Sequence, residues 1–107
     1  MPARGKVLIL TDLQIQLPEG YGRIVPRSGL ALEHHTDIGG GITDQNYRSN
    51  LGVILYNHWD KPFVVSRGDR IAYIICEKNY YPILEEVKIL DITKRGEGGF
   101  GSTGKYK

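Results

Sequence analysis

Cysteine is almost absent from this chain, since Cys76 is the only one among 107 residues. An internal disulfide is therefore excluded, and we expect a reducing compartment, the cytoplasm or the nucleus. Long hydrophobic runs are also lacking, because no apolar stretch approaches the roughly 20 residues of a membrane span. The first residues show no signal-peptide or transit-peptide pattern. We accordingly expect no membrane partner.

An excess of charge of one sign is lacking as well. The 14 Lys and Arg residues nearly balance the 12 Asp and Glu residues, which leaves a net charge of +2. Binding to duplex nucleic acid normally needs a concentrated basic face, so we expect no nucleic-acid partner. Glycine, by contrast, is abundant at 14 of 107 residues. This predicts many turns, or loops whose backbone lies against a ligand.

Short apolar or alternating segments separated by turn residues predict an all-β sandwich, jelly roll or barrel in a single domain. The expected strands are Lys6–Thr11, Leu13–Leu17, Gly22–Val25, Gly52–Asn57, Phe63–Val65, Arg70–Cys76 and Glu85–Leu90. The last of these also fits helical spacing. The stretch "RSGLALEHH" predicts one helical turn with Ser28 as its N-cap. From Thr93 onward the composition changes to glycine and charge, which predicts a mobile tail.

The first candidate for binding chemistry is "VPRSGLA", Val25 to Ala31. Arg27 offers a planar cationic fork, Ser28 a hydroxyl group, and Gly29 lies at a helix start with free backbone N–H groups. Together these groups suit phosphate oxygens. The alternative is a capped helix start with a surface arginine.

The second candidate is the glycine-rich stretch from Asp37 to Asn57. Three successive glycines allow a backbone to approach a flat ligand, and Asp44 could orient a water and accept its proton as a general base. Tyr47 could lie against a sugar or base ring. The alternative is a glycine-rich hairpin with a solvated Asp44 and a packed Tyr47.

The third candidate is the tail "RGEGGFGSTGKYK". Gly99 to Gly104 fits the G-x-G-x-x-G dinucleotide pattern, yet that pattern needs a strand before it and a helix after it. The tail offers phosphate and base ligands in Arg95, Phe100, Gly101, Ser102 and Thr103; the alternative is plain disorder. No metal site built from side chains is expected, because adjacent His34 and His35 rarely converge on one ion.

In this order, "PRSGLA", "GITDQNYRSNLGVILYN", "RGDRIAYII" and "RGEGGFGSTG" resemble motifs two to five of the trimeric dUTP diphosphatases (dUTPases). The resemblance implies a jelly-roll-like β subunit that forms a homotrimer with active sites at the subunit interfaces. It also implies hydrolysis of dUTP to dUMP and pyrophosphate, with water attacking the α-phosphorus and Mg²⁺ on the phosphates.

The same resemblance assigns roles to residues. Asp44 would activate the water, Tyr47 would pack under the deoxyribose, and backbone at Gly41 and Ile42 would pair with uracil. A neighbouring subunit would hold phosphates with Arg27, Ser28 and Gly29. Residues 1–92 would form the β domain, and residues 93–107 would form a flexible arm that closes over a neighbouring site. From that arm, Phe100 would stack on uracil, and the phosphates would be bound by Arg95, Gly101, Ser102 and Thr103.

Several positions depart from the family pattern. An "AGYDLYSA"-like first motif is missing from these residues, and its aspartate helps to hold the metal's water shell. Thr43, Asn46 and Ser49 replace usual residues of the third motif, and Tyr73 stands where glutamine normally contacts the phosphate region. These departures leave open a dUTPase-like binding or regulatory protein with weak catalysis. A relative that deaminates dCTP is a further alternative, which the tail and "ITDQNYR" disfavour.

Overall fold

Antiparallel β-strands form the body of the protein. The computed structural model describes residues 1–102 and residue 104. The regular elements in this part are β1 (Lys6–Leu10), β2 (Tyr21–Pro26), α1 (Ser28–His34), β3 (Thr36–Gly39), β4 (Ile42–Thr43), β5 (Gly52–Asn57) and β6 (Ala72–Glu77). The predicted all-β class with one helical turn is therefore confirmed. No helix among the described residues is long and apolar enough to cross a bilayer.

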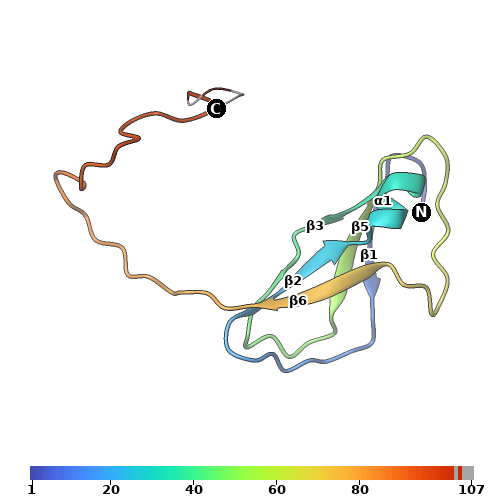
Figure 1. Cartoon of the computed structure of the whole chain (residues 1–107). Coiled ribbons are helices and arrows are strands. Elements are labelled where there is room, and N and C mark those ends of the chain that lie inside the picture. The colour runs from blue at the N-terminus through green and yellow to red at the C-terminus, as the bar shows by residue number, and fades with distance from the viewer. Residues whose placement is uncertain (103, 105–107) are drawn as a thin grey trace.

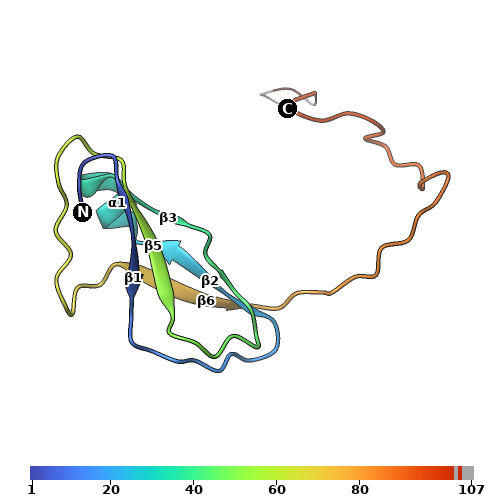
Figure 2. The same ribbon diagram turned by 180° about the vertical axis from the view of Figure 1, so that it is seen from behind.

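The strands form two three-stranded sheets, ordered β1-β5-β3 and β4-β2-β6. The two sheets make the two layers seen from opposite sides in Figures 1 and 2. Along β5, inward and outward side chains alternate, so that Val53 and Leu55 are buried while Ile54 is exposed. Ile24 from β2 packs with Leu51 and Val53 to form the core between the layers.

Four of the predicted strands correspond to β1, β2, β5 and β6, but three others are not strands in the structure. A strand needs a neighbouring edge to pair with, and alternation alone does not supply one. In the segment Leu13–Leu17, the Leu13 carbonyl accepts a hydrogen bond from the Leu51 N–H at 2.8 Å, but the segment joins neither sheet. Phe63 bonds back to Met1 rather than into a sheet. Glu85–Leu90 runs away from both sheets (Figure 1).

The helix α1 follows β2 with one residue between them. Ser28 was expected to be the N-cap, but it is the first helical residue and Arg27 is the cap. Arg27 has an extended backbone (φ −85°, ψ 131°) that continues the strand direction, which displaces the cap by one position. No side-chain hydrogen bond from a described residue caps this end. The helix ends at His35, which adopts the left-handed conformation with φ 57°.

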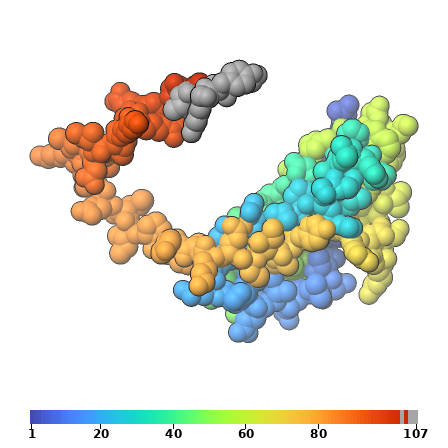
Figure 3. All heavy atoms as spheres, viewed as in Figure 1, coloured from blue at the N-terminus to red at the C-terminus, as the bar shows by residue number. Residues whose placement is uncertain are grey.

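Beyond Glu77, the described chain contains neither strand nor helix and extends away from the two sheets (Figures 1 and 3). The radius of gyration is accordingly 19.0 Å, against about 13 Å for a compact chain of this length. Large apolar side chains along this segment, such as Ile83, Leu84 and Ile92, are almost fully exposed. The division between residues 92 and 93 stays a prediction.

A buried amide joins the N-terminal segment to the loop after β5. The Asn57 side chain is 1% exposed. Its Nδ2 donates to the carbonyls of Pro2 (3.1 Å) and Lys61 (2.8 Å), while its Oδ1 accepts from the Trp59 N–H (3.1 Å). Because the Asn57 side chain is buried, its amide takes the place of water for three backbone groups at once.

Replacing Asn57 by alanine should therefore destabilise the fold. Two carbonyls and one N–H would lose their partner, and we expect a loss of about 3 kcal/mol in the free energy of unfolding. Denaturant titration measures this loss. Asn46 is exposed and its side chain bonds to no described residue, so Asn46→Ala is the control and should change stability by no more than about 0.5 kcal/mol. Equal effects of the two variants would contradict the role of Asn57.

Candidate active site

A pocket of about 430 Å³ opens beside the core, between the β1-β5-β3 sheet and the turn that leads into β4. Its polar end carries Asp44 and Tyr47, and its floor includes the core residues Ile24, Leu51 and Val53. The backbone of residues 39–43 forms one wall. Four predicted site residues therefore meet in one place: Gly41, Ile42, Asp44 and Tyr47.

Gly41 shapes this wall through an unusually close backbone contact. Its φ is +92°, and a Cβ at this position would lie 2.9 Å from the Ile24 carbonyl oxygen. The Ile24 N–H also donates to the Gly41 carbonyl at 2.7 Å. Only glycine fits such a position without displacing β2. This steric requirement explains why glycine occupies position 41 of the three-glycine motif.

Asp44 and Tyr47 belong to one tight turn. The Tyr47 N–H donates to the Asp44 carbonyl at 3.1 Å, and the Tyr47 hydroxyl donates to the Asn50 carbonyl at 2.7 Å. These two bonds fix the tyrosine ring, which lines the pocket. The Asp44 side chain is exposed and makes neither a hydrogen bond nor an ion pair with any described residue. Its carboxylate is available to a water or a ligand.

The cation closest in sequence does not neutralise Asp44. Arg48 directs Nη1 to the carbonyls of Gln45 (2.9 Å) and Tyr47 (3.0 Å). These bonds hold the guanidinium against the backbone of the turn. Arg48 therefore forms no ion pair with Asp44, although both side chains line a neighbouring shallow pocket.

Arg27 lines a different pocket, of about 380 Å³, together with Asp69, Arg70 and Tyr73. The two pockets share the core residues Ile24, Leu51 and Val53 but no charged side chain. Next to Arg27, Ser28 and Gly29 are exposed, and a Cβ on Gly29 would meet no atom within 4 Å. The structure thus keeps Arg27, Ser28 and Gly29 together, but apart from Asp44.

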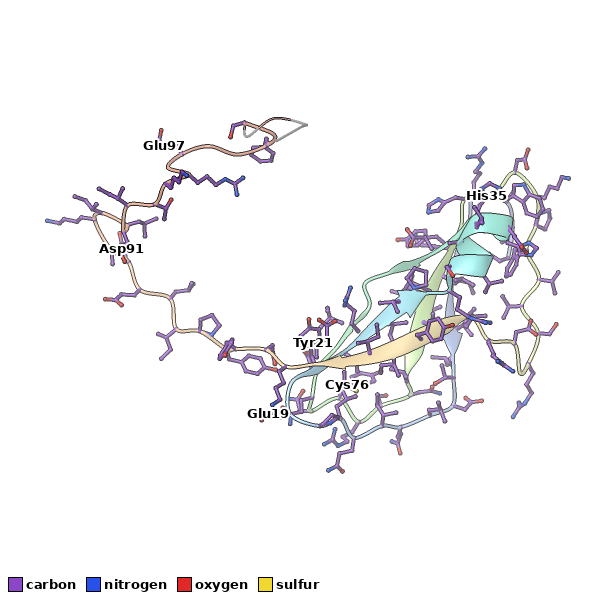
Figure 4. The ribbon with its side chains drawn as sticks, viewed as in Figure 1. Glu19, Tyr21, His35, Cys76, Asp91 and Glu97 are labelled. Atoms are coloured by element: carbon purple, nitrogen blue, oxygen red, sulfur yellow. The ribbon has the colours of Figure 1, made fainter. Side chains whose placement is uncertain are left out.

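The arm residues lie away from both pockets. In Figure 4, Asp91 and Glu97 mark the extended segment after Glu77, far from the sheets, whereas Glu19, Tyr21 and Cys76 mark the end of the body where this segment leaves. Arg95 Nε donates to the Gly98 carbonyl at 2.8 Å, and the Ser102 N–H donates to that of Gly99 at 3.1 Å. Phe100 is fully exposed. Gly101 has a φ of +88°. Thr103 lies outside the described residues.

One ion pair at the end of β6 was not expected from the sequence. Arg23 on β2 donates to the Glu77 carboxylate on β6. This hydrogen bond, and the negative charge of Glu77, raise the pKa of Arg23 above its ordinary value. The two residues are 54 positions apart, so no local sequence signal could have identified the pair.

The described residues contain no group of three or more His, Cys, Asp or Glu side chains that could hold a metal ion. The three histidines make aromatic contacts. The rings of His34 and His35 pack against Trp59, and the ring of His58 stacks on Tyr56. Any divalent cation would need ligands from outside this part of the chain, such as water or the phosphates of a bound nucleotide.

Fold and pocket together define an antiparallel β protein with an uncompensated carboxylate in a glycine-walled pocket. The dUTPase family model matches residues 1–104. The chain belongs to the dUTPase family. The jelly-roll-like fold expected from the sequence is supported by a solved dUTPase of Staphylococcus bacteriophage 80alpha with dUpNHpp. That structure has a TM-score of 0.84 and 28% identity, over 97% of this chain and 79% of the phage chain.

Among curated relatives, the Rattus norvegicus deoxyuridine 5'-triphosphate nucleotidohydrolase is 56% identical over 98% of this chain and 52% of its own length. The Homo sapiens relative, named mitochondrial, is 55% identical over 98% of this chain and 42% of its own length. The chain thus spans about half the length of these relatives.

The expected cytoplasmic or nuclear location is wrong by this comparison. The relatives from Homo sapiens and Dictyostelium discoideum are both named as mitochondrial proteins. A single cysteine excludes an internal disulfide, but it does not distinguish one reducing compartment from another.

The contact at Gly41 yields a direct test. Gly41→Ala would combine a strained φ with a clash against the Ile24 carbonyl, and we expect a loss of roughly 3 kcal/mol in stability. Gly68 has a similar φ of +90° with no atom within 4 Å of a Cβ, so Gly68→Ala should cost only about 1 kcal/mol. Thermal unfolding of both variants measures the difference. Equal losses would show that the close approach to β2 does not matter.

Proposed function

We propose that the protein hydrolyses dUTP to dUMP and pyrophosphate, at sites completed by neighbouring copies in a homotrimer. The observation that carries this proposal is the uncompensated Asp44 carboxylate beside the fixed ring of Tyr47 in the glycine-walled pocket. Membership of the dUTPase family along residues 1–104 supports it. So does the phage dUTPase, whose structure was solved with dUpNHpp, an imido analogue of dUTP.

In the proposed reaction, Asp44 accepts a proton from a water molecule as the water oxygen attacks the α-phosphorus. The bond from that phosphorus to the oxygen bridging the α- and β-phosphates breaks, and pyrophosphate leaves with the electron pair. Asp44 suits this role because it is exposed and has no partner among the described residues. General-base assistance of this kind contributes roughly a hundred- to ten-thousandfold to a rate.

The pocket walls account for recognition of the nucleoside in this proposal. Backbone at Gly41 and Ile42 would pair with the uracil edge, and its close approach would exclude a thymine methyl group. The hydrogen bond from the Ile24 N–H to the Gly41 carbonyl would hold this backbone in place. The Tyr47 hydroxyl donates a hydrogen bond to the Asn50 carbonyl. The ring face therefore stays available to the deoxyribose.

Two features support assembly. Arg27 lines a separate pocket from Asp44, so one copy does not bring both to a single substrate. Only four large apolar side chains of the described residues are buried, namely Ile24, Leu51, Val53 and Leu55, while Leu8, Leu10 and Tyr73 are more than half exposed. Apolar surface of this kind is commonly covered by a partner. In the proposed trimer, a neighbour's Arg27, Ser28 and Gly29 contact the phosphates.

The arm of residues 93–107 is proposed to complete the site from a third copy. Phe100 projects freely and can stack on the uracil, and Arg95, Gly101, Ser102 and Thr103 would contact the phosphates. The described residues of the arm extend away from both sheets (Figure 1). Such a segment can close when substrate is present and exclude water.

Mg²⁺ is proposed to enter with the substrate and neutralise charge on its phosphates. The described residues hold no acidic cluster for a resident ion. Mg²⁺ commonly keeps several waters and is bound through substrate phosphates, which fits this donor set. We therefore assign no residue of the chain as its direct ligand.

Asp44→Asn tests the proposal. The amide cannot accept the proton of the attacking water, so pyrophosphate release should fall at least about a hundredfold. Binding of dUpNHpp should change little, because the amide preserves the shape of the pocket. Asp60 is exposed and its side chain bonds to no described residue, so Asp60→Asn is the control and should retain full activity. A folded, trimeric wild-type protein without pyrophosphate release would refute the proposal.

A further inference from the structure

Tyr73 and Arg27 lie on the same face of the β4-β2-β6 sheet. Tyr73 on β6 is directly opposite Val25 on β2. Arg27 follows Val25 by two residues with an extended backbone, and side chains two apart on an extended segment share a face. Tyr73 and Arg27 are therefore diagonal cross-strand neighbours, a spacing that long or aromatic side chains can bridge.

The Arg27 guanidinium contacts Tyr73 on β6 and the backbone of Arg70, which precedes β6. Its Cζ lies 5.7 Å from the centroid of the Tyr73 ring, within the range of a cation–π interaction. Its Nη1 donates to the Arg70 carbonyl at 3.0 Å. One contact is made to the face of a ring and the other to a backbone oxygen, so together they restrict the plane of the guanidinium.

The charge of Arg27 is not neutralised within this part of the chain. Among the described residues, Arg23 forms an ion pair with Glu77, and His58 lies 4.0 Å from the Asp37 carboxylate. Asp69 lines the same pocket as Arg27, but its carboxylate accepts the Ser66 N–H at 2.8 Å. An arginine fixed in orientation, with donors remaining and no carboxylate partner, suits a phosphate oxygen.

We propose that Tyr73 is a positioning residue whose ring orients Arg27 toward the phosphates of the nucleotide. This inference rests on the proposed function. It gives a role to the one position of the fourth motif at which tyrosine replaces the usual glutamine. The ring acts through Arg27, so the phenolic hydroxyl is not needed.

The test compares Tyr73→Leu with Tyr73→Phe. Losing the ring should weaken binding of dUpNHpp about three- to tenfold and raise KM for dUTP more than it lowers kcat. Binding of deoxyuridine, which has no phosphate, should be unchanged. Tyr73→Phe keeps the ring and should behave as wild type. Tyr80→Leu removes a tyrosine that is 95% exposed and serves as the matched control.

A second comparison isolates the pair. In an Arg27→Lys background the compact ammonium loses the planar stacking surface, so adding Tyr73→Leu should cause little further loss of dUpNHpp affinity. Wild-type affinity in Tyr73→Leu would overturn the inference and leave the proposed function standing. A Tyr73→Phe variant as weak as Tyr73→Leu would also overturn it, because the hydroxyl would then be the active group.

Failure of the proposed function would be recognised separately. If wild-type protein does not bind dUpNHpp, the Arg27 Nε–H signal in nuclear magnetic resonance spectra decides the inference without nucleotide. Averaging of this signal in Tyr73→Leu, but not in Tyr73→Phe or Tyr80→Leu, would support the orienting role of the ring. An unchanged signal in Tyr73→Leu would overturn it.

Discussion

Gly41 approaches Ile24 so closely that a methyl group on its α-carbon would lie 2.9 Å from the Ile24 carbonyl oxygen. The hydrogen bond from the Ile24 N–H to the Gly41 carbonyl joins the same two residues. Ile24 is itself part of the small core with Leu51 and Val53. The turn that carries Asp44 is thus attached to the core through backbone atoms, which adjust far less than side chains. A catalytic carboxylate gains from such rigidity, because its position is set before substrate arrives.

The second organising feature is the separation of opposite charges. Asp44 and Arg27 both lack an ion-pair partner among the described residues, and they line different pockets. In one pocket they would neutralise each other and lower the charge available to substrate. Their separate pockets leave both groups without an ion pair, and in the proposed assembly a nucleotide would bridge them between neighbouring copies. In this account, the proposed hydrolysis requires the assembled trimer.

Much of the fold could be predicted from the sequence, because β1, β2, β5 and β6 show clear alternation or apolar runs. The strands β3 and β4 could not be recognised from the sequence, since both are short and the glycines beside them interrupt any alternation of apolar and polar residues. Leu13–Leu17 alternates correctly but pairs with no sheet, because pairing depends on distant strands. The glycine-rich stretch identified Asp44 and Tyr47 as candidates for one site. It could not reveal the contact of Tyr73 with Arg27, which the β2–β6 register creates across 46 positions of sequence.

The most direct measurement of the central claim mixes two inactive variants, Asp44→Asn and Arg27→Ala, after separate purification and joint refolding. The account predicts that pyrophosphate release from dUTP returns on mixing, because some sites then combine an intact Asp44 from one copy with an intact Arg27 from another. Random assembly at equal amounts should restore about one quarter of the wild-type rate. No recovery from a properly assembled mixture would contradict the claim that neighbouring copies share each site.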